Sequence, residues 1–402
     1  MNSSSHTVGS SPVCSRPAWN AVFSLALGVF GLVTAEFLPA SLLTPMASEL
    51  GISEGLAGQT VTVTALVALV TGLLIATVTR RIDRRYVLLA FSVLLMASNL
   101  LVACAPNLVA LLAARVLLGI ALGGFWTMSA ATAMRLVNVE QVPRALAMIF
   151  AGVSAATVAA APMGSYFGHV IGWRNVFLVA TALGLLAFVW QLLTLPSMAP
   201  SGSARLGTMV DVLRRPRIAV GMLACILVFT GHFAFFTYLR PYLEHVTGMG
   251  VTGVSAILLG FGLANFLGTS LAGFLLERNL KATLMVMPLI MGAVGLSLVS
   301  VGRAPVADAG LVALWGMAFG AVPVAWSTWL TRVVPDEAES GGGLIVAAVQ
   351  LAITMGAAAG GVLFDASGAR GVVLGSATVL LIAALTVFRG FRTRLAPAGC
   401  AG

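Results

Sequence analysis

The two halves of this chain repeat each other at a constant spacing of 197 residues. In this register, 76–84 (ATVTRRIDR) corresponds to 273–281 (GFLLERNLK), 119–123 to 316–320, Arg135 to Arg332, and Gly164 to Gly361. Because one unchanged spacing covers about ninety residues, we predict two structurally equivalent halves. Parallel repeats of this kind build membrane transporters whose halves rock around a central site.

The composition agrees with a membrane protein. A mean hydropathy of +1.03, with 59% hydrophobic and 9% charged residues, excludes a soluble globular domain and a disordered chain. Apolar runs of about 20 residues, long enough to cross a bilayer, recur along the chain. We expect twelve, near 18–42, 55–78, 86–105, 108–134, 145–169, 174–195, 218–239, 252–276, 282–302, 307–330, 343–364 and 371–389. The predicted fold is an all-α membrane protein of twelve transmembrane helices in two pseudo-symmetric six-helix halves.

Polar segments divide the chain. We predict a disordered cytoplasmic tail (1–17), an N-terminal half (18–195), a cytoplasmic linker (196–217), a C-terminal half (218–389) and a cytoplasmic tail (390–402). The first apolar span is too long for a signal-peptide core, so no cleavage is expected. The four cysteines have no C-x-x-C spacing, so we expect no disulfide framework, metal or cofactor.

The net charge of +9 is unevenly distributed. Most arginines follow alternate spans and therefore lie on one side, at positions 80, 81, 84, 85, 135, 144, 205, 214, 215, 217, 278, 332, 389, 392 and 394. The arginine-rich side of a membrane protein stays in the cytoplasm, so both termini are expected there. This distribution suits anionic lipid headgroups and argues against a nucleic-acid partner.

Glu36 is the acidic residue that lies deepest in an apolar span. Counted at 1.5 Å per residue from Thr44, it lies about 12 Å below the outer surface, and Arg115 lies about 10 Å below it when counted from Leu108. An ionisable side chain at that depth is costly, so a functional or pairing role is expected. We interpret Glu36 as a proton carrier and Arg115 as its coupling partner. The alternative is a static ion pair or a hydrogen bond between packed helices.

Charged loops form a second candidate site. The N-terminal copy carries Arg80, Asp83, Arg84 and Arg85, and the C-terminal copy carries Gly273, Glu277, Arg278 and Lys281. Ion pairs between such loops could break and re-form as the halves rock, which would make a cytoplasmic gate. The alternative is that the arginines only fix the topology.

Two aromatic stripes at helical spacing suggest a binding surface for a flat solute. One contains His232 and Phe236, and the other contains Trp326. The predicted substrate contacts are Gln59, Trp126, His232, Phe236, Asn265 and Trp326. The alternative for each aromatic residue is packing or lipid contact, and His232 reads more simply as a packed histidine.

Several motifs resemble the major facilitator superfamily. They are the twelve spans in two halves, the arginine-rich segment 80–85 with its echo at 277–281, and Arg115-x-x-x-Gly119. The superfamily usually has Asp where Arg80 stands and Gly where Asp83 stands. Within the superfamily, the chain resembles the twelve-helix drug:proton antiporters, although their fifth-helix signature is reduced to AAPMG at 160–164. Segments 36–65, 118–130, 171–177, 233–241 and 322–329 are similar to bacterial purine ribonucleoside efflux pumps.

The resemblance implies proton-coupled antiport. It suggests efflux of purine ribonucleosides such as inosine and guanosine across the bacterial inner membrane by alternating access. Facing aromatic stripes suit a nucleobase, but a sugar or drug antiporter of the same superfamily, or a membrane sensor that does not transport, remains open. The sequence shows no Ser/His/Asp set, metal cluster or phosphate-binding loop of the kind that would indicate an enzyme. We expect a monomer in the lipid bilayer whose partners are the nucleoside and protons.

Overall fold

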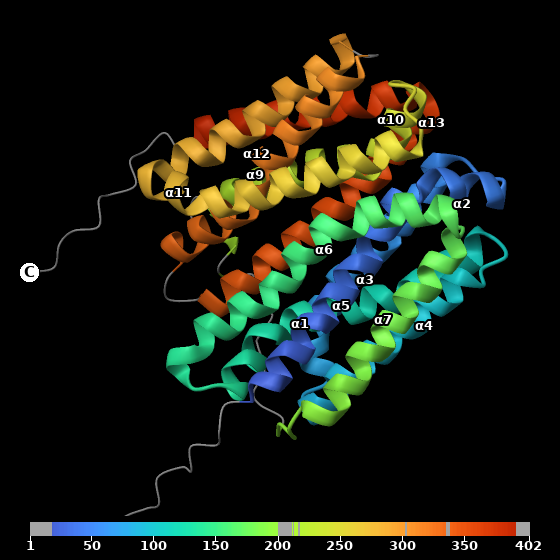
Figure 1. The fold of residues 1–402 in the computed structure, drawn as a ribbon. Coiled ribbons are helices and arrows are strands. Elements are labelled where there is room, and N and C mark those ends of the chain that lie inside the picture. The colour runs from blue at the N-terminus through green and yellow to red at the C-terminus, as the bar shows by residue number, and fades with distance from the viewer. Residues whose placement is uncertain are drawn as a thin grey trace, which may run out of the picture.

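The computed structural model describes residues 18–199, 211, 213–215, 218–301, 304–334 and 338–390, and all regular elements in these ranges are helices (Figure 1). They are α1 (Trp19–Ser41), α2 (Leu43–Leu50), α3 (Glu54–Val78), α4 (Arg84–Ala103), α5 (Leu108–Leu136), η1 (Val139–Gln141), α6 (Val142–Val170), α7 (Trp173–Thr194), α9 (Ile218–Thr237), α10 (Leu239–His245), α11 (Val251–Val301), α12 (Pro305–Val333) and α13 (Ala338–Gly390). The predicted tail 1–17, the tail residues 391–402 and most of the linker lie outside the described residues.

Twelve membrane crossings are present in the described part of the chain. Ten helices are long and apolar enough to span a membrane, and two of them are about 50 residues long. A straight helix of that length would measure about 75 Å, more than twice the ~30 Å hydrocarbon core. Each contains one non-helical residue, Asn279 in α11 and Gly368 in α13, where the chain turns back. At Gly368 the φ of 69° is one that glycine adopts readily.

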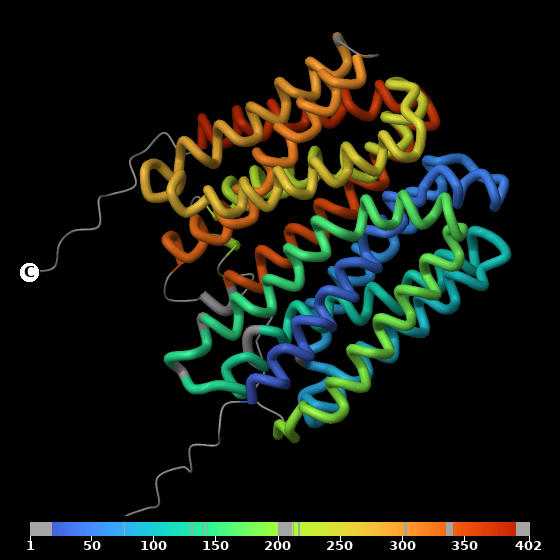
Figure 2. Tube along the Cα trace, in the orientation of Figure 1, coloured from blue at the N-terminus to red at the C-terminus, as the bar shows by residue number. Residues whose placement is uncertain are grey.

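The helices form two bundles, α1–α7 and α9–α13 (Figures 1 and 2). Two helix pairs make most of the contact between them: α3 packs against α13, and α6 against α11. In the repeat register the second and fifth spans of one half correspond to the eighth and eleventh. The two pairs are therefore equivalent, as expected for pseudo-symmetric halves.

Local sequence fixes several helix starts. The side chains of Ser53, Asp83 and Asn107 accept hydrogen bonds from backbone N–H groups in the first turns of α3, α4 and α5. These caps satisfy donors that have no partner within the helix. They hold the short connections at both ends of the N-terminal half.

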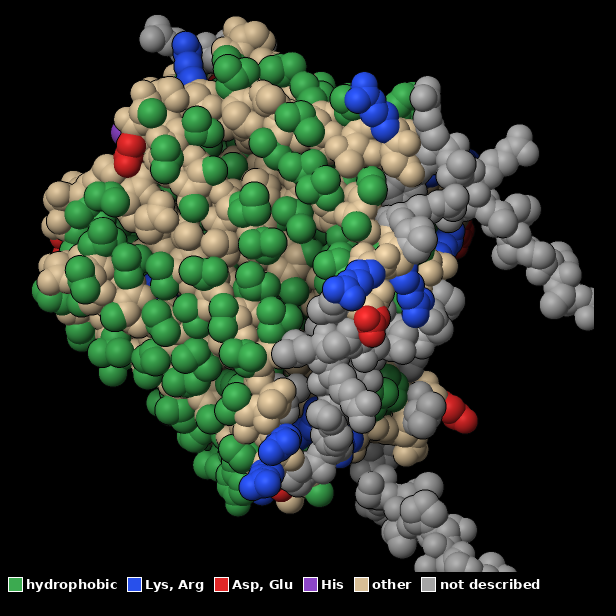
Figure 3. Space-filling model, turned by 180° about the vertical axis from the view of Figure 1, so that it is seen from behind, with side chains coloured by type: hydrophobic (Ala, Val, Ile, Leu, Met, Phe, Trp, Pro, Cys, Tyr) green, Lys and Arg blue, Asp and Glu red, His purple; other side chains and the backbone are tan. Residues whose placement is uncertain are grey.

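The surface has the pattern of a membrane protein. Figure 3 shows a wide hydrophobic face, with most of the visible lysines and arginines gathered at one edge. Because twelve crossings separate residues 18 and 390, both lie at that arginine-rich end. We call the opposite end, where α2 and α10 lie, the outer end.

Candidate functional site

Glu36 lies in α1 at the boundary between the two halves. Its side chain is almost fully buried and lines a small cavity together with residues of α1, α3, α9 and α13. The lining residues are Glu36, Phe37, Ala40, Val61, Phe233, Phe236, Thr237 and Ile353. The cavity volume is about 10 Å³, far less than the ~300–1,000 Å³ of typical ligand pockets. A nucleoside-sized ligand would therefore require the halves to separate further.

Arg115, on α5, reaches the backbone beside Glu36. Its Nη1 donates to the carbonyl of Ala35 (2.9 Å) and its Nε donates to Oγ1 of Thr64 (3.0 Å). The Ala35 carbonyl would normally accept from the N–H of the residue four positions on, but that residue is Pro39, which has no N–H. Arg115 therefore supplies the hydrogen bond that Pro39 cannot. Its other terminal nitrogen, Nη2, is buried without a hydrogen-bond partner in the described structure.

The structure brings Arg115 and Glu36 to neighbouring positions without a salt bridge. No pair of their charged atoms lies within 4.0 Å in this described part of the chain. The guanidinium is anchored to α1 and α3, so the carboxylate is left facing the cavity. This arrangement combines a buried cation with an acid that is not tied to it.

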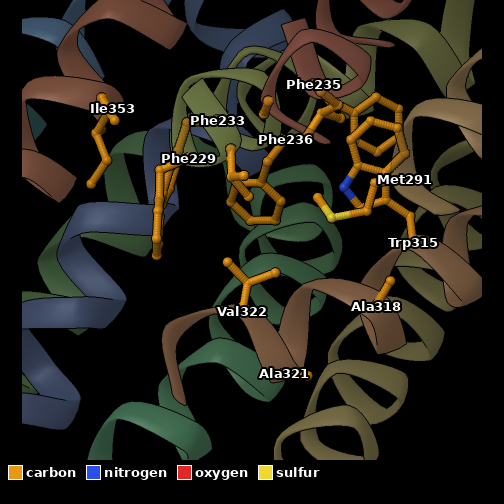
Figure 4. Packing of buried hydrophobic residues seen from close by; sticks show 14 of the residues in the cluster. Phe229, Phe233, Phe235, Phe236, Met291, Trp315, Ala318, Ala321, Val322 and Ile353 are labelled. Atoms are coloured by element: carbon orange, nitrogen blue, oxygen red, sulfur yellow. The ribbon is translucent and has the colours of Figure 1, made fainter. Parts of the chain in front are cut away.

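Aromatic rings form one wall of the cavity. The ring of Phe236 meets Phe37 of the other half edge-on, with centroids 5.4 Å apart. On its own side it lies near Phe261 (5.4 Å) and stacks on His232 (5.7 Å). Figure 4 shows Phe233 and Phe236 projecting from α9, with Ile353 opposite. Of the predicted substrate residues, Phe236 lies directly in the cavity wall.

His232 is a packed histidine behind that wall. Its ring lies parallel to Phe319, with centroids 3.3 Å apart. Nε1 of Trp315 donates to Nδ1 of His232 (3.2 Å), so Nδ1 is an acceptor. Trp315 itself stacks on Phe235 (3.9 Å). The side chain of His232 thus supports the cavity wall from within the C-terminal half.

The other predicted substrate residues do not line this cavity. Trp126 stacks on Phe150 (5.9 Å) within the N-terminal half, and Trp326 packs edge-on against Trp329 (5.4 Å). Asn265 donates to the carbonyl of Gly316 (3.3 Å) between α11 and α12. Gln59 makes a long contact with the carbonyl of Gly55 (3.4 Å).

The N-terminal loop charges are held within their own half. Asp83 caps α4 and accepts hydrogen bonds from Oγ of Ser197 and from the backbone N–H of Met198 (2.9 Å). These hydrogen bonds, the one from Ser197 most of all, hold the pKa of Asp83 below its ordinary value. Arg85 donates to the carbonyl of Leu192 (2.9 Å), and Arg80 is exposed.

The C-terminal loop charges lie near the surface. Glu277 and Gly273 are exposed, and an added Cβ at Gly273 would meet no atom within 4 Å. The guanidinium of Arg278 lies over the ring of Phe274 (4.4 Å). Lys281 and Arg84, the remaining predicted gate residues, are half-buried.

Sequence reasoning missed a group of polar contacts at the outer end. Arg240 of α10 donates to the carbonyl of Ser41 and pairs with Glu244 (2.8 Å). Nearby, Asp308 is fully buried and accepts from Oγ1 of Thr247 (2.9 Å). Asp308 is the fourth residue of α12. In the sequence, an acidic residue shortly after a proline indicates only that a helix begins there.

A comparison with known families decides the class of this protein. Residues 25–354 match the Major Facilitator Superfamily. The chain belongs to this superfamily. It is therefore a multi-pass membrane transporter and not an enzyme.

Related proteins match nearly the whole chain. It is 47% identical over 372 residues to the purine ribonucleoside efflux pump NepI of Salmonella typhimurium LT2, covering 92% of this chain and 94% of that protein. It is 48% identical, with the same coverage, to NepI of Escherichia coli K12. Among solved structures, a bacterial homologue of the human lysosomal transporter Spinster, in an inward-facing and unoccupied conformation, matches with a TM-score of 0.76. That match has 17% identity and covers 96% of this chain and 98% of the other.

Superfamily membership agrees with the cavity's position. A cavity lined by α1 and α3 from one half and by α9 and α13 from the other lies where rocking halves would expose it to each side in turn. The fold likeness to the Spinster homologue supports the same architecture. The predicted all-α fold of two six-helix halves is confirmed.

Proposed function

We propose that this protein exports purine ribonucleosides such as inosine and guanosine in exchange for protons. It works by alternating access in the bacterial inner membrane, as a monomer with both termini in the cytoplasm. The substrate class is supported by the relatives named as purine ribonucleoside efflux pumps. The arginine-rich end supports the orientation.

The buried carboxylate of Glu36 carries the proposal. It faces a cavity formed by both halves, so a movement of the halves changes its access to water on either side. An acid in such a position can take a proton from one side and release it to the other. The anchored guanidinium of Arg115 stays close to it, which favours release of the proton when the cavity is open to the cytoplasm.

The aromatic wall suits the base of a nucleoside. Phe37, Phe233 and Phe236 present ring surface from both halves, while Glu36 and Thr237 offer hydrogen-bonding groups for a ribose. Stacking of a base on an aromatic side chain contributes about 1–3 kcal/mol to binding in proteins that bind single-stranded nucleic acid. Gln59, Trp126, Asn265 and Trp326 remain candidate contacts for a more open state. The charged loops at 80–85 and 273–281 remain candidates for the cytoplasmic gate.

Transport into inside-out vesicles tests the proposal. The measurement is accumulation of labelled inosine into vesicles whose interior is acidic, which an outward antiporter drives at the expense of the pH gradient. Wild-type protein should accumulate inosine, and Glu36→Gln should not. Glu36→Gln should still exchange labelled for unlabelled inosine without a gradient, since the amide preserves the shape of the side chain.

The exposed Glu140 provides a matched control. Glu140→Gln makes the same chemical change outside the cavity and should transport normally. Gradient-driven accumulation by Glu36→Gln at the wild-type rate would remove Glu36 from the coupling step. Accumulation of a sugar but not of inosine would favour the alternative substrate class.

A further inference from the structure

Four polar contacts join the halves at the outer end, and we call them the outer clasp. Ser53 donates to Oδ2 of Asp365 (3.0 Å). The hydroxyl of Tyr238, which also donates to the carbonyl of Ala357 in its own half (3.1 Å), makes a longer contact with the carbonyl of Gly55 across the halves (3.4 Å). Arg240 donates to the carbonyl of Ser41. The fourth contact joins Nε2 of His245 to both carboxylate oxygens of Glu54 (3.1 Å each).

The clasp is tightly packed around the start of α3. A Cβ added to Gly55 would lie 2.5 Å from the carboxylate of Asp365, and one added to Gly361 would lie 2.8 Å from the carbonyl of Gly55. A side chain at either glycine would therefore overlap atoms of the opposite half, so the halves approach closely here. The outer end is therefore closed in this structure, and opening it must break all four contacts.

His245 is the histidine of the clasp, and histidine is the residue type that serves as a charge switch in the physiological pH range. Its helix, α10, packs against α1, α2, α9, α11 and α13. Other charged or histidine side chains at this end include Arg240, Glu244, Glu49, Arg174, His169, Asp308, Asp365 and Arg370. Arg240 is paired with Glu244, Glu49 with Arg174, and Asp308 and Asp365 accept from hydroxyl groups. Glu54 is thus the carboxylate that His245 contacts directly.

We propose that the His245–Glu54 contact makes closure of the outer end depend on external pH. Protonated His245 forms an ion pair with Glu54 that holds the outer end closed. Neutral His245 leaves only a hydrogen bond across the halves. Acid outside the membrane therefore favours the state that is closed to the outside, in which the cavity can accept substrate from the cytoplasm. This inference rests on the alternating access in the proposed function.

The expected size of the effect follows from exposure. The side chain of His245 is 54% exposed and that of Glu54 is 11% exposed. Ion pairs with an exposed partner change an equilibrium between about 1.4-fold and fivefold, and the effect weakens with added salt. The clasp therefore adjusts the balance between two states and does not lock the protein.

Distance measurement between two spin labels tests the proposal without any transport assay. Labels at Ser48→Cys and Thr252→Cys, both exposed and on opposite halves of the outer end, would report its opening. The four native cysteines would first be replaced, and Glu36→Gln would remove the central carboxyl from the titration. In lipid nanodiscs, the population with a short distance should rise up to fivefold as the pH falls from about 8 to about 5.

Two substitutions at His245 separate charge from structure. His245→Lys should hold the closed population near its acid value at every pH, and His245→Gln should hold it near its alkaline value. Glu54→Gln should abolish the pH response. His169→Gln provides the control, since His169 is an exposed histidine at the same end of the molecule and should leave the response unchanged.

The outcomes distinguish the clasp from the transport cycle. A pH response that persists in His245→Gln, or that disappears in His169→Gln, would overturn the clasp. An outer distance that stays fixed in all variants at every pH, and also with added inosine, would overturn alternating access itself.

Discussion

Gly262→Ala tests how closely the two halves must approach in this state. Gly262 is buried in α11 and faces α6 of the other half. A Cβ at this position would lie 2.8 Å from Cα of Val158 and 3.1 Å from its carbonyl oxygen. Both are backbone atoms, so no side-chain rotation can relieve the overlap, and α6 and α11 must move apart.

The size of the effect can be worked from that overlap. Overpacking by one methyl group in a well-packed interface costs about 1–3 kcal/mol. Since 1.4 kcal/mol corresponds to a factor of ten, the population of this state should fall between about fivefold and 150-fold. The pair of spin labels at the outer end would show a longer distance, and inosine transport should fall as the return to this state becomes difficult.

Gly260→Ala is the matched control. Gly260 lies two residues away on the same helix, and a Cβ there would meet nothing within 4 Å. Both variants make the same gain in helix propensity, up to about 1 kcal/mol. Equal distance distributions in Gly260→Ala and Gly262→Ala would show that the approach of α6 and α11 does not limit the state.

Three further predictions concern single side chains. Arg115→Ala should lower the free energy of unfolding by about 1–3 kcal/mol because it leaves a backbone carbonyl unpaired; Pro39→Ala should restore part of this loss by supplying the missing N–H, as thermal unfolding would reveal. Phe236→Ala should weaken inosine binding about tenfold or more, measured by competition, whereas Phe229→Ala, outside the cavity wall, should not. Glu49→Gln should lower stability at neutral pH by at most about 1 kcal/mol. The hydrogen bond from Arg174 holds the pKa of Glu49 below its ordinary value. The stabilisation is therefore present above the ordinary carboxyl pKa and is lost as the pH falls through the lowered pKa of Glu49. A stability difference between wild type and Glu49→Gln that stays constant down to acid pH would contradict this account.

The sequence predicted the fold because each signal acts within one segment or one half. Apolar length identifies a span, and the constant repeat spacing relates equivalent spans. The residues that line the cavity were partly accessible for the same reason. Glu36 is an acid in an apolar run, and Phe236 lies on an aromatic helix face. Phe37 and Thr237 carry no such signal, since a phenylalanine or threonine in a membrane helix is ordinary.

Contacts between the halves could not be predicted in the same way. His245 and Glu54 are far apart in the sequence and are not equivalent in the repeat, so neither periodicity nor the repeat register relates them. Trp326 belongs to a helical stripe as predicted, but periodicity gives a face without saying what lies opposite. In this structure its ring packs against Trp329, three residues along the same helix, and does not line the cavity. Which residues of the two halves meet depends on the relative orientation of the halves, and the sequence alone does not specify that orientation.

The length of α3 links the outer clasp to the arginine-rich end of the protein. This helix runs for 25 residues, or about 37 Å, with Glu54 at one end and the arginine-rich segment 80–85 just beyond the other. If it moves as a rigid lever about its middle, each ångström of opening outside displaces those arginines by a similar amount relative to the lipid headgroups. Anionic headgroups hold basic side chains with about 1 kcal/mol each. In the proposed orientation, the charge of the inner leaflet would act as a mechanical load on the proposed transport cycle, so we expect turnover to depend on the lipids around the protein even when the substrate and the pH gradient are unchanged.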